Sequence, residues 1–173
     1  MSSKTGTKLI LFLIVLGVIL SEPLFSAGGS VNNLPKDELQ LHVVIKAVSY
    51  VGIAYRFGGT DARGVDCSGF ITTLLRDVIP SLPRRVRDLY GFGLPVKKEE
   101  LEPGDLVFFN TTSTVSARAN PSHVGFYIGD EHFIHAASKG ERTGVIISSL
   151  KKRYYVERYV GSRRVLHLAA EHR

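Results

Sequence analysis

The chain of 173 residues contains a single cysteine, Cys67, and that residue lies in a segment with strong local signals. Gly58-Gly59 and Gly64 precede it, which indicates a tight approach of the backbone. Asp66, directly before it, is a favourable helix-capping residue, and an apolar segment with helical spacing follows. The pattern predicts a sulfur on the first turn of a helix, where unpaired N–H groups and the helix dipole favour a thiolate.

A lone cysteine has two common interpretations. Free cysteine is among the most buried residue types, so Cys67 could be an apolar filler of the core. The chain begins like an exported protein, however, and oxidising compartments usually hold cysteines in pairs. A thiolate is a nucleophile. The neighbouring residues therefore favour a free thiol with a catalytic function.

The amino-terminal segment has the pattern of a secretory signal peptide. Lys4 and Lys8 precede the apolar run Leu9–Leu20, and small residues follow at Ser26–Gly29. The run is short for a membrane span, which needs roughly 20 residues, although an uncleaved anchor is the alternative. We predict a signal peptide over 1–27, a flexible leader over 28–36 and one domain over 37–173.

The charge balance is modestly basic. The formal net charge is +6, and removal of residues 1–27, with Lys4, Lys8 and Glu22, would leave +5. Such an excess suits contact with an acidic polymer such as cell wall, membrane surface or nucleic acid. No nucleic-acid motif is present, so no nucleic-acid partner is predicted. Five arginines are interpreted as parts of solvated faces: Arg84, Arg85, Arg87, Arg163 and Arg164.

Helical patterns come first and strand patterns afterwards, which is α+β order. Helices are predicted from Asp37 to about Val51, from Cys67 to about Val78 and over Arg84–Tyr90. A polar loop is predicted over 111–121. The predicted strands are Leu106–Phe109, Val124–Ile128, Phe133–Ala136, Val145–Ile147 and Tyr154–Val160.

A cysteine nucleophile needs a base, and the base needs an orienting partner. Among six histidines, His123 and His135 flank a turn whose midpoint is Gly129. A register symmetric about that glycine places the two rings opposite each other on one sheet face, and His132 in the turn or on the other face.

This histidine pair has two other interpretations. One is a surface histidine and a satisfied core histidine. The other is a zinc site formed with Cys67, but metal ligands usually show short local spacing as well. We therefore predict an orienter–base pair and no metal.

An ordered set of motifs then resembles one known family. Each motif is weak alone, but their order and spacing together are specific. The motifs are Tyr55, Phe57-Gly58-Gly59, Asp66-Cys67-Ser68-Gly69-Phe70, Leu82-Pro83-Arg84, Pro103-Gly104-Asp105-Leu106, Ser122–Gly129 and Phe133-Ile134-His135-Ala136. This set resembles the NlpC/p-sixty family of bacterial cell-wall cysteine peptidases. Gly144–Ser149 and Arg163-Arg164-Val165 further resemble the small murein endopeptidases of Gram-negative bacteria.

The resemblance implies a papain-like α+β fold, with the cysteine helix packed on an antiparallel sheet. It implies hydrolysis of peptidoglycan stem peptides, at γ-D-glutamyl–diamino-acid bonds or D-alanyl–diaminopimelate cross-links. Cys67 would be the nucleophile, His123 the base and acid, and His135 the orienter. Tyr55 matches a position near the oxyanion site, and Asp66 and Ser68 match positions that line the stem-peptide pocket.

Several further expectations accompany this interpretation. No cofactor is implied, and an exported monomer of the periplasm or cell envelope, without a stable membrane anchor after signal cleavage, is expected. Tyr55 is also compatible with an ordinary core position, and Asp66 with a helix cap alone. The alternative functions are amidase or acyl-transfer chemistry on the same scaffold, and a non-catalytic wall-binding module.

Overall fold

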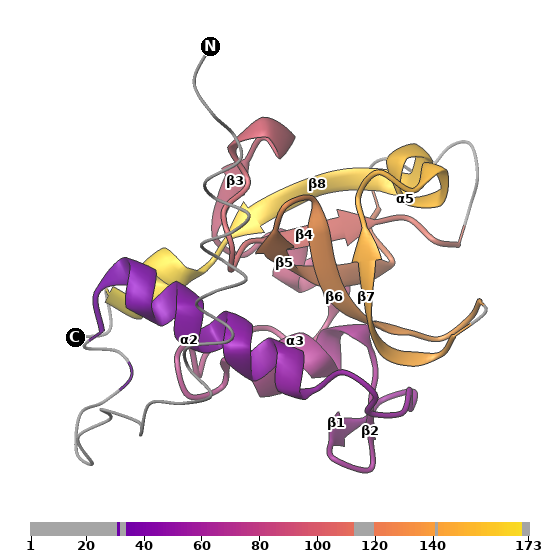
Figure 1. Ribbon diagram of the computed structural model, residues 1–173, viewed down its shortest axis with the longest axis horizontal. Helices are drawn as coiled ribbons and strands as arrows, with labels where there is room; N and C mark the ends of the chain where they lie inside the picture. The colour runs from indigo at the N-terminus through magenta and orange to yellow at the C-terminus, as the bar shows by residue number, and fades with distance from the viewer. Residues whose placement is uncertain (1–30, 32–33, 113–119, 141, 171–173) are drawn as a thin grey trace. The chain divides into compact units, whose positions relative to one another are not determined.

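The computed structural model in Figure 1 describes residues 31, 34–112, 120–140 and 142–170. These residues all belong to one structural unit, Val31–Arg173. The predicted signal peptide, most of the predicted leader and the centre of the loop predicted over 111–121 lie outside them. Within the described part of the chain, no helix has the length and apolar character that crossing a bilayer requires.

The order of the elements confirms the α+β prediction. The helices are α2 (Lys36–Ser49), α3 (Cys67–Leu75), α4 (Val86–Tyr90) and α5 (Arg153–Arg158), with 3₁₀ turns η2 (Lys98–Glu100) and η3 (Leu166–Ala170). The strands are β1 (Thr60–Asp61), β2 (Gly64–Val65), β3 (Leu94–Val96), β4 (Leu106–Phe109), β5 (His123–Gly129), β6 (His132–Ala137), β7 (Gly144–Ser149) and β8 (Tyr159–Arg164).

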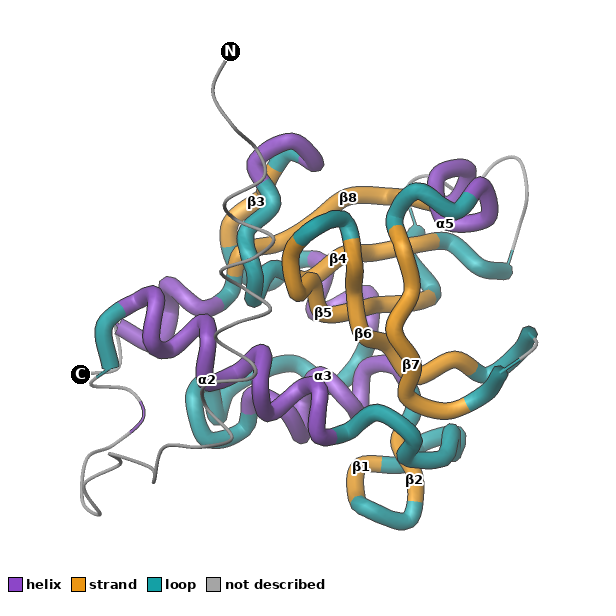
Figure 2. The backbone as a smooth tube through the Cα atoms, in the orientation of Figure 1, coloured by secondary structure: helices purple, strands orange, loops and turns teal. Residues whose placement is uncertain are grey.

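Six strands form one antiparallel sheet in the order β3-β8-β4-β5-β6-β7, while β1 and β2 form a separate small hairpin. The sheet twists strongly, so that β6 and β7 run across the direction of β4 and β8 (Figure 2). The central strand β4 is buried on both faces of the sheet. Its four residues are therefore all apolar and do not alternate with polar ones.

The two faces of the sheet pack against different elements. On one face, Phe108, Phe126 and Ile134 join the main core with Phe70 of α3 and Val43 of α2. On the other face, a smaller cluster contains Phe109, Tyr127 and Phe133, with Tyr155 of α5 packed against it. Successive side chains of β5 and β6 point to opposite faces of the sheet, so neighbouring residues belong to different clusters.

The hairpin register differs from the prediction. Phe126 lies opposite Ile134 and Tyr127 opposite Phe133, so the register is displaced by two residues from symmetry about Gly129. The cause is a turn at Asp130 and Glu131, which both have positive φ, together with a shift in pairing between Tyr127 and Gly129. The direct opposition of His123 and His135 is therefore wrong. A displacement of two keeps both rings on the same face, because side chains alternate with period two.

The strand predicted over Tyr154–Val160 is also wrong for most of its length. Residues Arg153–Arg158 form the helix α5, and strand β8 begins only at Tyr159. Aromatic and β-branched residues favoured a strand locally, but here Tyr155 packs against the sheet as part of a helical turn. This difference brings the Tyr155 side chain to the sheet face that carries the histidines.

Three of the arginines assigned to solvated faces have specific partners instead. Arg164 donates from Nε and Nη2 to the two oxygens of the buried Asp105, at 3.0 and 2.9 Å. The guanidinium of Arg163 lies 4.1 Å from the centroid of the Tyr90 ring. The third, Arg84, belongs to the site described next.

Candidate active site

Cys67 is the first residue of α3, as predicted, and Asp66 is its N-cap. The Asp66 Oδ1 atom accepts from the backbone N–H of Gly69 at 2.7 Å, and Oδ2 accepts from that of Gly58 at 2.9 Å. One carboxylate therefore caps the helix and ties it to the preceding glycine turn. The Cys67 side chain is partly exposed, so its sulfur is not a fully buried filler.

Two glycines allow the cysteine helix to approach that turn. A Cβ atom on Gly69 would overlap the carbonyl oxygen of Gly59, which is backbone and cannot rotate away. A Cβ atom on Gly59 would in turn overlap the carbonyl oxygen of Gly64. Gly59 and Gly69 are thus required by close backbone contact, as the pattern indicated. Gly58 has open space around it, and its positive φ of 73° is what favours glycine there.

We expect Gly69→Ala to lower the free energy of unfolding by about 1–3 kcal/mol, because the new methyl group overpacks this contact. Urea denaturation followed by circular dichroism measures the change. Gly91→Ala is the matched control, since its Cβ would lie 3.5 Å from the Asp88 carbonyl oxygen, an ordinary contact. Equal stability of the two variants would contradict this account.

Arg84 joins the acidic cap to Ser68. Its Nη1 donates to Asp66 Oδ1 at 2.9 Å and to Ser68 Oγ at 2.7 Å, and its Nη2 donates to Asp66 Oδ2 at 2.7 Å. Burial alone would raise the pKa of the Asp66 carboxyl, but hydrogen bonds from Arg84, Gly69 and Gly58 lower it. Both carboxylate oxygens already have protein partners, so a ligand would meet the Arg84–Asp66–Ser68 cluster and not a free carboxylate.

The environment of the sulfur does not by itself favour a thiolate. Burial raises the pKa of the Cys67 thiol, and the adjacent Asp66 carboxylate adds to this increase. Hydrogen bonding by the backbone N–H groups of Val124, Ser68 and Cys67 itself opposes the rise without cancelling it. The helix start alone does not lower the pKa of this thiol, so a base is needed to remove its proton, as expected from the sequence.

Tyr55 lies near the same sulfur. Burial raises the pKa of its phenol, and the charges of Cys67 and Asp66 raise it further, while a hydrogen bond with Ser138 lowers it. The backbone of Tyr55 also forms a bridge with Val65, close to the start of α3. Tyr55, Asp66 and Ser68, predicted separately from the sequence, are thus gathered around the helix that begins at Cys67.

The two predicted histidines meet directly. His123 Nε2 and His135 Nδ1 are 2.8 Å apart, and the ring planes are nearly perpendicular at 88°. His135 is 2 % exposed. Because the Val124 N–H lies at the Cys67 sulfur, the start of β5 and with it His123 lie at the beginning of α3. Among the described residues no hydrogen bond joins Cys67 to His123, and such bonds often tighten only when substrate is bound.

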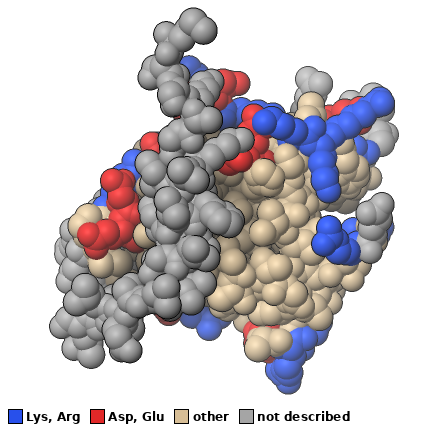
Figure 3. Space-filling view, in the orientation of Figure 1, with Lys and Arg blue, Asp and Glu red and all other residues tan. Residues whose placement is uncertain are grey.

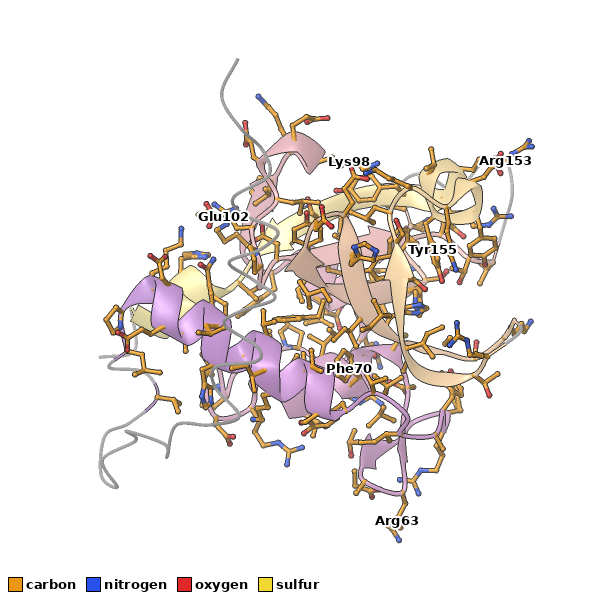
Figure 4. All side chains as sticks on the ribbon, in the orientation of Figure 1. Arg63, Phe70, Lys98, Glu102, Arg153 and Tyr155 are labelled. Atoms are coloured by element: carbon orange, nitrogen blue, oxygen red, sulfur yellow. The ribbon has the colours of Figure 1, made fainter. Side chains whose placement is uncertain are left out.

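The sequence did not identify two hydroxyl groups behind His135. His135 Nε2 lies 3.0 Å from Ser148 Oγ of β7 and 3.1 Å from the Tyr155 hydroxyl of α5. Figure 4 shows Tyr155 between α5 and the strands, whereas Arg153 points away. In the sequence, Ser148 lies within the segment Gly144–Ser149 that resembles the family, and the pattern around Tyr155 predicts a strand. No local signal indicated that either residue would contact His135.

The electrostatics keep both imidazoles neutral. Burial lowers the pKa of His123 to about 4. Burial, followed by the charges of His123 and Lys152, lowers the pKa of His135 to about 2. At neutral pH, before substrate binds, Cys67 is therefore a thiol and His123 is a neutral imidazole. A neutral imidazole is able to accept the proton of the thiol.

These pKa directions predict a broad pH–activity plateau. We expect the acid limb of kcat/KM to lie below about 6.5, the ordinary histidine pKa, and the alkaline limb above about 8.5, the ordinary cysteine pKa. The unfolded chain takes up protons near pH 6.5, whereas the folded histidines resist them, so stability falls as pH falls below that value. Circular dichroism at each pH separates unfolding from loss of catalysis. An acid limb at or above pH 6.5 in folded protein would contradict the neutral-imidazole account.

No group of three or more His, Cys, Asp or Glu side chains in the described part of the chain is arranged to hold a metal ion. The side chains brought together at this site supply a thiol, a neutral base and a second imidazole. A cysteine at a helix start beside an antiparallel sheet with paired histidines defines the papain-like α+β class.

The comparisons with known proteins specify the family. The model of the NlpC/P60 family matches residues 52–164, which include every site residue named above. The chain belongs to this family, as the motifs in its sequence predicted.

Three bacterial relatives are similar over most of the chain. A probable endopeptidase NlpC homolog of Haemophilus influenzae is 42% identical over 118 residues, 68% of this chain and 58% of the relative. A probable endopeptidase NlpC of Escherichia coli is 37% identical over 157 residues, 86% of this chain and 97% of the relative. The Escherichia coli murein DD-endopeptidase MepS/murein LD-carboxypeptidase is 36% identical over 130 residues, 75% of this chain and 64% of the relative.

A solved structure supports the same fold. The crystal structure of an NlpC/P60 family protein from Bacillus cereus has a TM-score of 0.65 and 34% sequence identity to this chain. The match covers 73% of this chain and 40% of that protein. The likeness thus concerns the matched part of the Bacillus cereus protein.

Proposed function

We propose that this chain is a peptidoglycan hydrolase that cleaves peptide bonds of stem peptides with Cys67 as its nucleophile. The single observation that carries the proposal is the contact of His123 Nε2 with His135 Nδ1 beside the start of the cysteine helix. The contact engages one nitrogen of His123 and leaves Nδ1 for a proton from the thiol. The names of the murein and NlpC-type endopeptidase relatives supply the substrate class.

In this mechanism, His123 Nδ1 takes the proton of the Cys67 thiol as the sulfur attacks the scissile carbonyl carbon. The carbonyl oxygen becomes an oxyanion, and in this proposal the Cys67 backbone N–H and the Tyr55 hydroxyl stabilise it. The proton on His123 then passes to the leaving amine as the C–N bond breaks. A water molecule, deprotonated by His123, attacks the thioester and releases the acid product and the free thiol.

The charge around the site suits an acidic substrate. Lys and Arg side chains gather around α5 on the face in Figure 3, where Lys151, Lys152 and Arg153 are all exposed. Lys151 and Arg153 form ion pairs with Glu131 and Glu157, but Lys152 has no ion pair among the described residues. Stem peptides carry free carboxylates, so this basic region favours their approach.

Export to the periplasm or cell envelope is part of the proposal, because the substrate is located there. It is supported by Lys4 and Lys8 before the apolar run Leu9–Leu20. Amino-terminal sequencing of the protein recovered from the envelope tests it. A mature start between Ala27 and Gly29 supports cleavage, whereas a start at Met1 in the membrane fraction indicates an anchor instead.

Mass spectrometry of wall fragments tests the activity and identifies the bond. Purified peptidoglycan is incubated with the protein, and the masses of the released fragments are compared with those from a Cys67→Ala sample. Cleaved D-alanyl–diaminopimelate cross-links and cleaved γ-D-glutamyl bonds produce different fragments. Release of intact stem peptides from the glycan would indicate an amidase. Wall binding without any thiol-dependent fragment would indicate a binding module.

A further inference from the structure

His135 is held from three elements at once. It lies on β6, its Nδ1 contacts His123 of β5, and its Nε2 contacts both Ser148 of β7 and Tyr155 of α5. Its ring also packs against Phe133 at 4.9 Å and against Tyr155 at 5.6 Å between centroids. Such close packing leaves little freedom for the ring to turn over. The position of its single proton, however, depends on its hydrogen-bond partners.

Only one hydrogen fits between His123 Nε2 and His135 Nδ1. If it belongs to His135, then His123 is protonated on Nδ1 and cannot accept the thiol proton. If it belongs to His123, then His123 Nδ1 is open, and His135 carries its own proton on Nε2. The two arrangements have the same heavy atoms, and only the second provides a base.

The hydroxyl groups behind His135 distinguish these arrangements. The Ser148 hydroxyl donates to the Tyr155 oxygen across 3.5 Å, so its hydrogen is directed away from His135. Its lone pairs then face His135 Nε2 at 3.0 Å and accept a proton from that nitrogen. We propose that Ser148 and Tyr155 are positioning residues that hold the His135 proton on Nε2 and thereby keep His123 Nδ1 open as the base.

The surrounding charges fit this role. The groups that face His135 are His123 from β5, Phe133 from its own strand, Ser148 from β7, and Tyr155 and Lys152 from the α5 region. Burial, the charge of His123 and that of Lys152 all disfavour a second proton on His135. The charge that forms during the reaction therefore stays on His123, next to the thiolate and the leaving group.

The mechanistic part of this inference rests on the proposed function, so its test includes a readout that does not depend on activity. Nitrogen-15 NMR of the imidazole rings distinguishes a protonated ring nitrogen from an unprotonated one. In the wild-type protein above pH 7, we expect Nε2 to carry the proton in both His123 and His135. Ser148→Ala removes the acceptor 3.0 Å from His135 Nε2 and leaves the Tyr155 hydroxyl, at 3.1 Å, as the remaining partner of that nitrogen. Because a hydroxyl can donate to an unprotonated Nε2, we expect protonation of Nδ1 to appear.

Kinetics on a defined stem peptide supply the second readout. We expect Ser148→Ala and Tyr155→Phe to lower kcat by about 10–100-fold with little change in KM, similar to the loss of a partner that orients a metal-bound histidine. Ser148→Thr retains the hydroxyl and should retain most of kcat. Tyr154→Phe is the matched control, because Tyr154 is the neighbouring tyrosine of α5 and is 46% exposed.

The two readouts separate the possible outcomes. Protonation of His135 on Nδ1 in the wild-type protein would overturn the inference, whatever the activity. Unchanged kcat and unchanged tautomers in both Ser148→Ala and Tyr155→Phe would overturn it as well. If the wild-type protein cleaves no stem peptide, the proposed function fails, and the NMR measurement alone still decides the tautomer. Thermal unfolding of each variant identifies losses of kcat that are due to instability.

Discussion

Cys67→Ala is expected to abolish cleavage of stem peptides while the protein remains folded. The thiol is partly exposed at the first turn of α3, so its removal leaves no large cavity in the core. Removal of a nucleophile that acts together with a base typically costs about 10⁶ in kcat. The rate on a defined stem peptide, followed by chromatography of the products, measures the loss.

Cys67→Ser is the companion variant. It keeps a side chain of similar size but supplies a hydroxyl that ionises far less readily than a thiol. We expect the same loss of activity, with a circular dichroism spectrum and melting temperature close to those of the wild type. Wild-type activity in folded Cys67→Ala would contradict the assignment of the nucleophile.

His123→Ala is expected to lower kcat/KM by about 10²–10⁴, because the base takes part in every proton transfer of the cycle. His132→Ala is the matched control. His132 lies on the same hairpin but pairs with Gly129 and Ser149, on the opposite face of β6 from His135. Its replacement should leave kcat/KM within the scatter of a surface change.

His135 should rank between these two. His135→Ala removes the acceptor for the His123 Nε2 proton, whereas the amide oxygen of Gln in His135→Gln can still accept it. We therefore expect His135→Gln to lose less activity than His135→Ala. If His132→Ala is as damaging as His123→Ala, the assignment of the base must be rebuilt.

Local signals predicted the start of the cysteine helix well. The Asp66 cap, the glycines before it and the apolar spacing after it all act within a few residues, so the sequence contains them directly. The hairpin was harder to predict, because its register depends on the turn. Two residues with positive φ, Asp130 and Glu131, displaced the pairing by two positions and removed the direct opposition of the histidines.

The helix α5 could not be predicted from propensity. Its aromatic residues favour a strand, and packing against Phe109 and Phe133 holds Tyr155 in a helical turn instead. The ion pair of Arg84 could not be predicted from the local sequence either. Arg84 is distant from Asp66 in sequence, and only the fold brings its guanidinium to both carboxylate oxygens.

By itself, the sequence determined the α+β order, the family, the helix start at Cys67 and the placement of His123 and His135 on one sheet face. Periodicity, capping and motif order can be read from the local sequence. The shared face of the two histidines also persists when the register shifts by two residues, because side chains alternate with period two. Only the tertiary structure decided which ring nitrogens of the two histidines face each other and what lies behind His135. Ser148 and Tyr155 reach that ring from β7 and α5, and such contacts depend on packing between elements that no local pattern encodes.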